Sequence, residues 1–176
     1  MAYLLDTNAF IEARKRWYGF DFCPAYWDWL ETAHDAGTVF SIERVADEIQ
    51  AGDDELVDWS RARGEQFFLR PDGAVLASLS QLSSWATGGA YEPAAVTTFL
   101  DIADSYLVAH AHAHGHTVVT MEVVSNSPRI IKVPNACVAM DVRYVNVFTM
   151  LRTERARFVL DVTSSEGGDG AGRHPS

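Results

Sequence analysis

The chain has 176 residues, of which 48% are hydrophobic and 22% are charged, a balance typical of one soluble globular domain with its own core. Lysine and arginine number 14 against 24 aspartates and glutamates, which gives a formal net charge of −10. This charge excludes a protein that coats nucleic acid or anionic membranes through bulk attraction. It does not exclude a nuclease, because an acidic metal site can lie beside a small basic patch.

The N-terminal half alternates short apolar runs with segments of helical periodicity. Its first apolar run ends at Asp6, and in a parallel sheet the carboxyl end of a strand is where ligands bind. Thr7 and Asn8 are expected to cap the helix that follows. In chain order, this half predicts a strand over 2–6, a helix over 9–16, a helix over 24–36, a strand over 38–42, helices over 43–51 and 54–64, and a strand over 66–70. The second of these helices has one apolar face, made by Tyr26, Trp27, Leu30 and Ala33.

The C-terminal half continues the alternation of helices and strands as far as residue 121, and an irregular stretch interrupts it over 128–141. It predicts helices over 72–86, 93–98 and 101–114, a strand over 117–121, an irregular stretch over 128–141, a helix over 144–153 and a strand over 157–162. Gly115 is expected to end the helix that precedes it. Strands that alternate with helices predict an α/β fold, a three-layer sandwich with a mostly parallel central sheet. We expect one domain over residues 1–162 and a disordered tail over 163–176, which is rich in serine and glycine.

Cysteine content and the N-terminus bear on the compartment. Cys23 and Cys137 are too few for a disulfide framework and are expected to be reduced, buried thiols. No apolar run approaches the roughly 18 residues that cross a bilayer, so no membrane association is expected. No basic segment precedes an apolar one at the start of the chain, so no signal peptide is expected. These features predict a protein of the reducing cytoplasm.

Four acidic residues fall at or near the predicted strand ends. Asp6 ends the first strand, Glu122 follows the strand over 117–121, Asp104 lies in the first turn of the helix before that strand, and Glu48 lies in the helix over 43–51. Carboxylates that converge cannot all stay ionised without a cation. Mg²⁺ or Mn²⁺ suits such oxygen ligands best, and an acidic cluster holding Mg²⁺ is a standard solution for phosphodiester hydrolysis.

Each acid also has a purely structural interpretation. Asp101 and Asp104 are both suited to the first turn of a helix, where they stabilise unpaired N–H groups. Glu48 can pair with Arg44, one turn earlier on the same helix. Asp6 is harder to explain in this way, because a carboxylate that ends an apolar strand has little structural use.

Four short segments around these acids occur in an order typical of one known family. They are Leu-Leu-Asp6-Thr7-Asn8, Val-Ala-Asp-Glu48-Ile, Ala-Asp104-Ser-Tyr-Leu and Thr-Val-Val-Thr120-Met-Glu122. Together they resemble a PIN domain, the metal-dependent ribonuclease fold of VapC-type toxins. Two further segments, Tyr-Gly-Phe-Asp-Phe-Cys-Pro at 18–24 and Val-Pro-Asn-Ala-Cys at 133–137, resemble a narrower PIN-like branch. The resemblance spans roughly residues 2–152.

The resemblance implies a catalytic metal site for Mg²⁺ or Mn²⁺ whose ligands are Asp6, Glu48, Asp104 and Glu122. In that site Asp6 and Asp104 are the central ligands. Thr7 and Asn8 match the small polar residues that orient the first aspartate, and Thr120 matches a hydroxyl position near the last acid. Two features depart from the family: Glu122 stands where many members carry aspartate, and the segment over 53–100 is longer than in minimal toxins.

The activity that the resemblance implies is cleavage of single-stranded or structured RNA by metal-activated water. The products carry 5′-phosphate and 3′-hydroxyl ends, and no side-chain nucleophile is needed. PIN toxins are commonly homodimers bound by a small antitoxin protein, so both partners are expected here. The alternative is a catalytically inactive PIN-like module that binds protein or RNA through its aromatic segment over 17–29. A haloacid-dehalogenase-type phosphohydrolase is disfavoured, because Asn8 stands where that chemistry needs a second acid.

Cations and rings suited to RNA occur in two places. The candidates for phosphate binding are Arg14, Lys15, Arg16, Arg129 and Lys132. Trp17 and Tyr18 add rings that can stack on bases. The structural alternative is a helix end whose cations suit the helix dipole and whose rings belong to the core.

A run of alternating histidines has the composition of a metal site but not its spacing. On a helix only His110 with His114, and His112 with His116, share a face. No carboxylate partner stands nearby in the sequence, so a zinc site is not expected. We interpret these four residues as surface histidines.

Overall fold

The computed structural model describes residues 1–159. Its centre is a five-stranded sheet with the order β3-β2-β1-β4-β5. The strands are β1 (Tyr3–Leu5), β2 (Val39–Ile42), β3 (Phe68–Leu69), β4 (Thr117–Val119) and β5 (Tyr144–Val145). All four pairings are parallel, with Leu4 of β1 in register with Phe40 on one side and Val118 on the other. The predicted parallel α/β sandwich is therefore confirmed.

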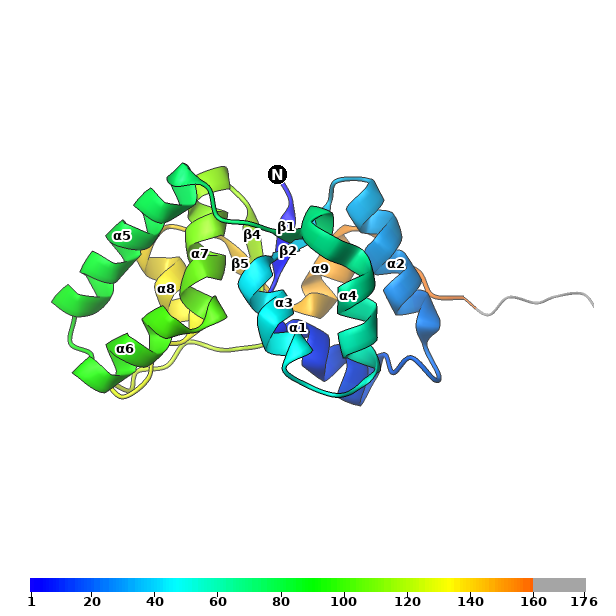
Figure 1. Ribbon diagram of the computed structural model, residues 1–176, viewed down its shortest axis with the longest axis horizontal. Coiled ribbons are helices and arrows are strands. Elements are labelled where there is room, and N and C mark those ends of the chain that lie inside the picture. Colours follow the sequence, from blue (N-terminus) through cyan, green and yellow to red (C-terminus); the bar gives the residue numbers. More distant parts are fainter. Residues whose placement is uncertain (160–176) are drawn as a thin grey trace, which may run out of the picture.

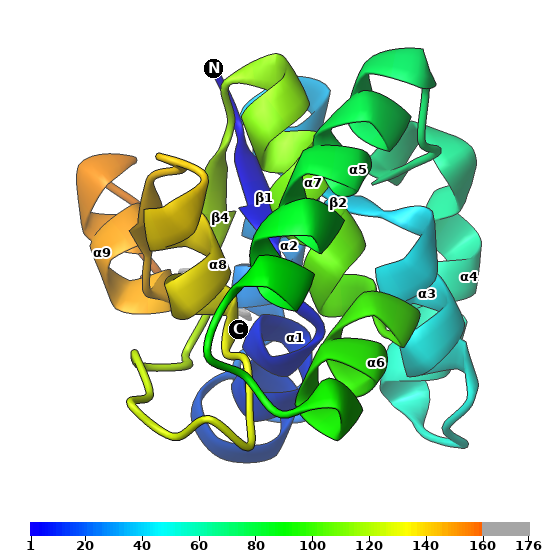
Figure 2. The ribbon, with the colours of Figure 1, turned by 90° about the vertical axis from the view of Figure 1, so that its left-hand side faces the viewer.

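Helices cover both faces of this sheet (Figure 1). They are α1 (Thr7–Glu12), the π-helical turn η1 (Ala13–Trp17), α2 (Pro24–Asp35), α3 (Glu43–Gln50), α4 (Glu55–Phe67), α5 (Gly73–Gly88), α6 (Pro93–Asp101), α7 (Ala103–His114), α8 (Val133–Ala139) and α9 (Val147–Thr153). On one side α7 packs on β2 and β4, with α5 and α6 outside it and α8 alongside (Figure 2). On the other side α2 and α4 pack on β2.

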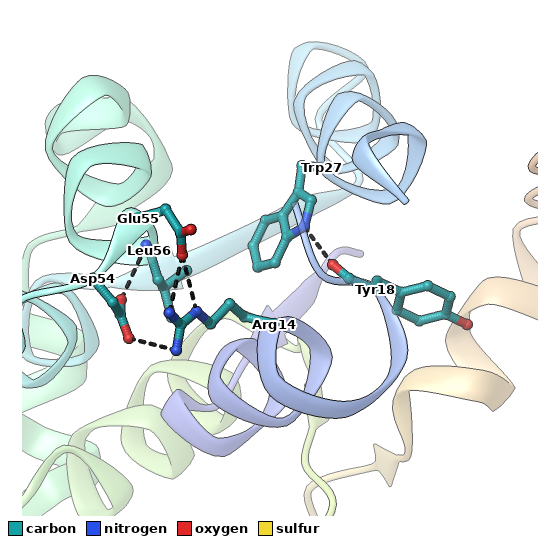
Figure 3. Close-up of polar contacts among 6 residues, drawn as sticks. All are labelled: Arg14, Tyr18, Trp27, Asp54, Glu55 and Leu56. Carbon is teal, nitrogen blue, oxygen red and sulfur yellow. Dashed lines mark hydrogen bonds and ion pairs between the residues drawn. The ribbon is translucent and has the colours of Figure 1, made fainter. Parts of the chain in front are cut away.

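The core confirms the apolar face that helical spacing predicts for α2. Tyr26, Trp27, Leu30 and Ala33 are all buried. The ring of Tyr26 stacks on Tyr18 at 4.4 Å between centroids, and Trp27 stacks on Phe20 at 4.1 Å. The indole Nε1 of Trp27 donates to the carbonyl of Tyr18 at 2.7 Å, which fastens the loop before α2 to that helix (Figure 3). Much of the aromatic segment therefore belongs to the core.

The capping predicted for the first helix is wrong. The helix begins at Thr7 itself, and Asp6 holds the position before it without a side-chain cap. The backbone N–H of Ala9 donates to the Asp6 carbonyl at 3.0 Å. The side chains of Thr7 and Asn8 are left free for contacts at the carboxyl edge of the sheet, where the helix starts.

The C-terminal half departs further from its predicted elements. The stretch over 128–141 is not wholly irregular, because α8 lies within it with Pro134 in its first turn, where proline is tolerated. The predicted helix over 144–153 divides into β5 and α9, and the Asn146 side chain caps α9 by accepting from the Thr149 N–H at 2.8 Å. Asp101 ends α6 rather than opening α7. Residues 157–159 form no strand, and 160–162 and the predicted tail lie outside the described residues.

Both cysteines are free, as predicted; Cys137 is buried and Cys23 is half-buried. Within residues 1–159, no helix is both long enough and apolar enough to cross a membrane.

The interpretation of all four histidines as surface residues is wrong for His110. Its side chain is 2% exposed, because α7 lies between the sheet and α5. The Nδ1 of His112 lies 2.9 Å from the hydroxyl of Ser78 in α5. The Nε2 of His114 lies 3.2 Å from a carboxylate oxygen of Asp72, the residue before α5. These histidines connect α7 to α5. Gly115 ends the helix in the left-handed conformation, as predicted.

The buried imidazole of His110 predicts an acid-sensitive fold. Burial, followed by repulsion from His114, lowers its pKa to about 4, whereas an unfolded histidine titrates near about 6.5. Between these values the unfolded chain binds a proton that the folded chain does not, so stability is lost as pH falls. From pH 7 to pH 5 we expect the free energy of unfolding to fall by about 1–2 kcal/mol more in the wild type than in His110→Leu. Urea unfolding of both proteins measures this difference, and parallel pH profiles would contradict it.

Candidate functional site

The site begins where the two central strands end. Asp6 follows β1 and Thr120 follows β4, and the backbone N–H of Asp6 donates to the Val119 carbonyl at 2.9 Å. Because β1 and β4 are parallel neighbours, both residues reach the same edge of the sheet. The Thr120 hydroxyl donates to Asp6 Oδ2 at 2.8 Å. Asp6 is only 1% exposed, so its carboxylate is held in place rather than solvated.

All four predicted acids line one cavity of about 610 Å³ at this edge, which we call the acidic cavity. Asp6 comes from the end of β1, Glu48 from α3, Asp104 from the first turn of α7 and Glu122 from the segment after β4. Figure 2 shows α1, α6 and α3 near one another below the carboxyl end of β1. The cavity also has an apolar wall that was not predicted from the sequence, formed by Ala95, Phe99, Ile102, Ile130 and Ile131. Its signal was the paired isoleucines directly before Lys132.

The electrostatics show that these carboxylates affect one another. Burial raises the pKa of Asp104 to about 8, with further contributions from the charges of Asp6, Glu122 and Glu48. Burial also raises the pKa of Asp6 to about 6, a shift that the Thr120 hydrogen bond opposes and the neighbouring glutamates increase. The ionised forms of these two carboxyl groups are therefore disfavoured as long as no cation compensates their charge. A cation bound there would remove the repulsion.

Glu48 bridges two other parts of the site. Its Oε2 accepts from the Thr7 hydroxyl at 2.5 Å, and its Oε1 accepts from the backbone N–H of Ala103 at 3.0 Å. The second contact satisfies an N–H group at the start of α7, one residue before Asp104. Thr7 thus orients Glu48. The exposed Asn8 side chain lines the acidic cavity.

Glu122 is held by the segment before α8. Its Oε1 pairs with the Lys132 ammonium, and its Oε2 accepts from the backbone N–H of Val133 at 3.0 Å. Its own backbone N–H donates to the Thr120 hydroxyl at 3.1 Å. Thr120 therefore links two of the four acids, because the same hydroxyl donates to Asp6.

Within residues 1–159, no three histidine, cysteine, aspartate or glutamate side chains already stand in an arrangement that ligates one ion. The carboxylate oxygens of Glu48 and Glu122 already accept hydrogen bonds from protein donors. The donor set nevertheless fits a hard divalent cation, since it consists of carboxylate oxygens in a partly buried cavity whose charges repel one another. Binding of the cation by all four would require the two glutamates to turn from their present partners.

The five cations predicted to bind phosphate lie in different parts of the structure. Arg14 pairs with Asp54 at 3.0 Å and with Glu55 at 2.9 Å, so it fastens η1 to the start of α4 (Figure 3). Lys15 is exposed and lines a different cavity beside Arg14. Arg16 lines a groove next to the acidic cavity.

The other two candidates lie at the acidic cavity itself. Arg129 pairs with Glu92 at 3.3 Å, and Lys132 pairs with Glu122. Both cations line the cavity, so their positions are compatible with contact to a phosphate bound near the acids.

Two solved structures resemble this chain in fold. One is FitAB bound to an IR36 DNA fragment, with a TM-score of 0.50 and 22% identity, over 82% of this chain and 94% of that chain. The other is VapBC2 from Rickettsia felis bound to a DNA fragment from their promoter, with a TM-score of 0.48 and 15% identity, over 83% of this chain and 98% of that chain. The fold is PIN-like. No curated protein matches the sequence. A family profile matches residues 3–158, and the chain therefore belongs to the family described as Domain of unknown function (DUF4411).

Proposed function

We propose that the protein is a divalent-metal-dependent ribonuclease of the toxin type. One observation carries this proposal: four acids from four separate segments of the chain line a single cavity at the carboxyl edge of a parallel sheet. A structural role for each acid taken singly does not account for their convergence. Burial of Asp6 and the raised pKa of Asp104 also make this arrangement costly for the fold without a compensating cation.

Each residue of the cavity has a task in this proposal. Asp6 and Asp104 hold Mg²⁺ or Mn²⁺, and Thr120 fixes the orientation of Asp6. Glu48 and Glu122 complete the site directly or through bound water. The cation supplies polarisation of the phosphodiester and a lowered pKa of the attacking water. Arg129 and Lys132, which line the same cavity, bind the RNA phosphates in this proposal.

A protein partner and a homodimer are part of the same proposal. Exposed apolar side chains line the cavity and occur in the segment after Glu122: Ile102, Ile130, Val123 and Val124 are 37%, 40%, 78% and 50% exposed. Exposed apolar side chains beside a polar site are suited to a protein interface. The partner we propose is an antitoxin that covers this surface and blocks the cavity.

A catalytically inactive binding module is the second candidate. It is favoured by the contacts of Glu48 and Glu122, which are satisfied by protein donors in the present arrangement. In such a module the acids would serve to connect α1, α3, α7 and the segment before α8. RNA binding without cleavage would be the signature of this function.

The experiment that separates the two is incubation with total RNA and with transfer RNA. The divalent cation, Mg²⁺ or Mn²⁺, is supplied in one arm and removed by a chelator in the other, and the ends of the products are mapped. We expect cleavage only with the cation, giving 5′-phosphate and 3′-hydroxyl ends. Binding without cleavage in either arm would favour the module. Cleavage that continues unchanged in chelator would contradict the proposed metal dependence.

A further inference from the structure

A second groove opens directly beside the acidic cavity. This side groove has a volume of about 410 Å³ and is lined by Asn8, Glu12, Arg16, Trp17, Met121 and Glu122. Two of its residues, Asn8 and Glu122, also line the acidic cavity. The two hollows therefore adjoin one another at Asn8 and Glu122, so a strand bound at the carboxylates lies next to the side groove.

One cation, Arg16, lines the side groove. Arg16 lies two residues after Arg14, and positions two apart on a helix face in nearly opposite directions. Arg14 accordingly faces α4, where it forms ion pairs (Figure 3). Arg16 lines the groove, and its side chain is 69% exposed. Its Nε pairs with Glu12 at 2.8 Å. Among the described residues, its two terminal nitrogens have no side-chain partner.

The groove also carries an aromatic ring whose position is fixed. Trp17 is half-buried, and its ring meets the edge of Phe148 at 5.0 Å between centroids and 63° between planes. Its position is set by the end of η1, where the Tyr18 N–H donates to the Ala13 carbonyl at 2.7 Å. Trp17 lines the groove, and an aromatic ring in such a place can stack on a single-stranded base.

We propose that the side groove binds the nucleotide next to the scissile phosphate of a single-stranded RNA, with its base stacked on Trp17 and its phosphate bound by the terminal nitrogens of Arg16. This rests on the proposed function, which places the scissile phosphate in the acidic cavity. Local contacts matter here because the net charge of −10 provides no general attraction for RNA. Sequence-tolerant stacking, rather than hydrogen bonding to base edges, would then hold this part of the strand.

The test measures the binding of a short, labelled single-stranded RNA by fluorescence anisotropy in chelator, which withholds the cation that the proposed cleavage requires. The variants are Arg16→Ala and Trp17→Ala, with Arg61→Ala as the matched control, since it removes the same side chain from an exposed position that lines neither the acidic cavity nor the side groove. We expect each groove variant to bind about ten-fold more weakly and the control to stay within about two-fold. Arg16→Ala should also reduce the slope of log affinity against log salt by about 0.7.

Two further measurements separate stacking from folding and this inference from the proposed function. Trp17→Tyr keeps an aromatic ring and should restore most of the affinity that Trp17→Ala loses. If the wild type cleaves RNA but both groove variants bind like Arg61→Ala, the side groove is not a nucleotide site and the inference is overturned, while the proposed nuclease stands. If no cleavage occurs but the groove variants still weaken binding, the groove assignment holds and the nuclease fails. A wild type that does not bind the strand at all overturns the inference.

Discussion

Asp6→Asn is expected to abolish metal-dependent RNA cleavage while leaving the fold intact. Replacement of groups that only orient a metal ligand typically costs about 10–100-fold, so loss of a central ligand should lower the rate by more than about 10²-fold. The fold should survive because the amide oxygen of asparagine can accept the Thr120 hydrogen bond that Asp6 Oδ2 now accepts at 2.8 Å. Single-turnover cleavage of a labelled RNA measures the rate, and urea unfolding measures the stability.

The matched control for this substitution is Asp101→Asn. Asp101 is an exposed acid at the end of α6, outside the acidic cavity, and its backbone carbonyl accepts from Arg44 at 3.1 Å. The same chemical change at Asp101 should leave cleavage within about two-fold of the wild type, because side-chain changes away from the site are generally small. Asp6→Asn protein that folds and cleaves at the wild-type rate would contradict the assignment of the active site.

Asp104→Asn is expected to stabilise the metal-free protein at alkaline pH. An unfolded aspartate ionises near 3.8, whereas the pKa of Asp104 in the fold is raised to about 8, chiefly by burial. Between these values the folded chain keeps a proton that the unfolded chain releases, so stability falls as pH rises through this window. Asparagine carries no such charge. At pH 8 in chelator we expect the variant to be more stable than the wild type by about 2–3 kcal/mol, or about 5–10 °C in Tm.

With divalent cation in place of chelator, we expect the wild type to be more stable than Asp104→Asn. A cation bound to the folded wild type stabilises it by mass action, and removal of Asp104 weakens that effect. Thermal unfolding of both proteins at pH 5 and pH 8, with Mn²⁺ and with chelator, gives the four comparisons needed. The difference in chelator should shrink at pH 5. A wild type whose Tm is the same at both pH values and unaffected by Mn²⁺ would contradict the proposed site.

Part of this site was predictable from the sequence, because three of its acids lie at or near the ends of predicted strands. Asp6 and Glu122 follow apolar runs that proved to be neighbouring parallel strands, so the shared edge was implied by the fold class alone. Asp104 was predictable in the same way, because its helix feeds the second of these strands. The parallel sheet and the buried face of α2 followed from periodicity, which depends on short-range spacing that a sequence displays directly.

The remaining features depend on packing between distant segments. The contact from Glu48 to the Ala103 N–H joins residues 55 positions apart, and no local pattern encodes it. Arg14 and Arg16 look alike in the sequence. In the fold, α4 packs beside η1, so Arg14 forms ion pairs with the start of α4, whereas Arg16 lies at the side groove. His110 was misjudged for the same reason, since only the position of α5 decides which face of α7 is buried.

Anomalous diffraction from crystals grown with Mn²⁺ tests most directly whether the acidic cavity is a metal site. We expect an anomalous peak within coordinating distance of both the Asp6 and Asp104 carboxylates, with Glu48 or Glu122 turned toward it directly or through water. A peak confined to other surfaces of the protein, with the four carboxylates keeping their present contacts, would contradict the proposed hydrolase.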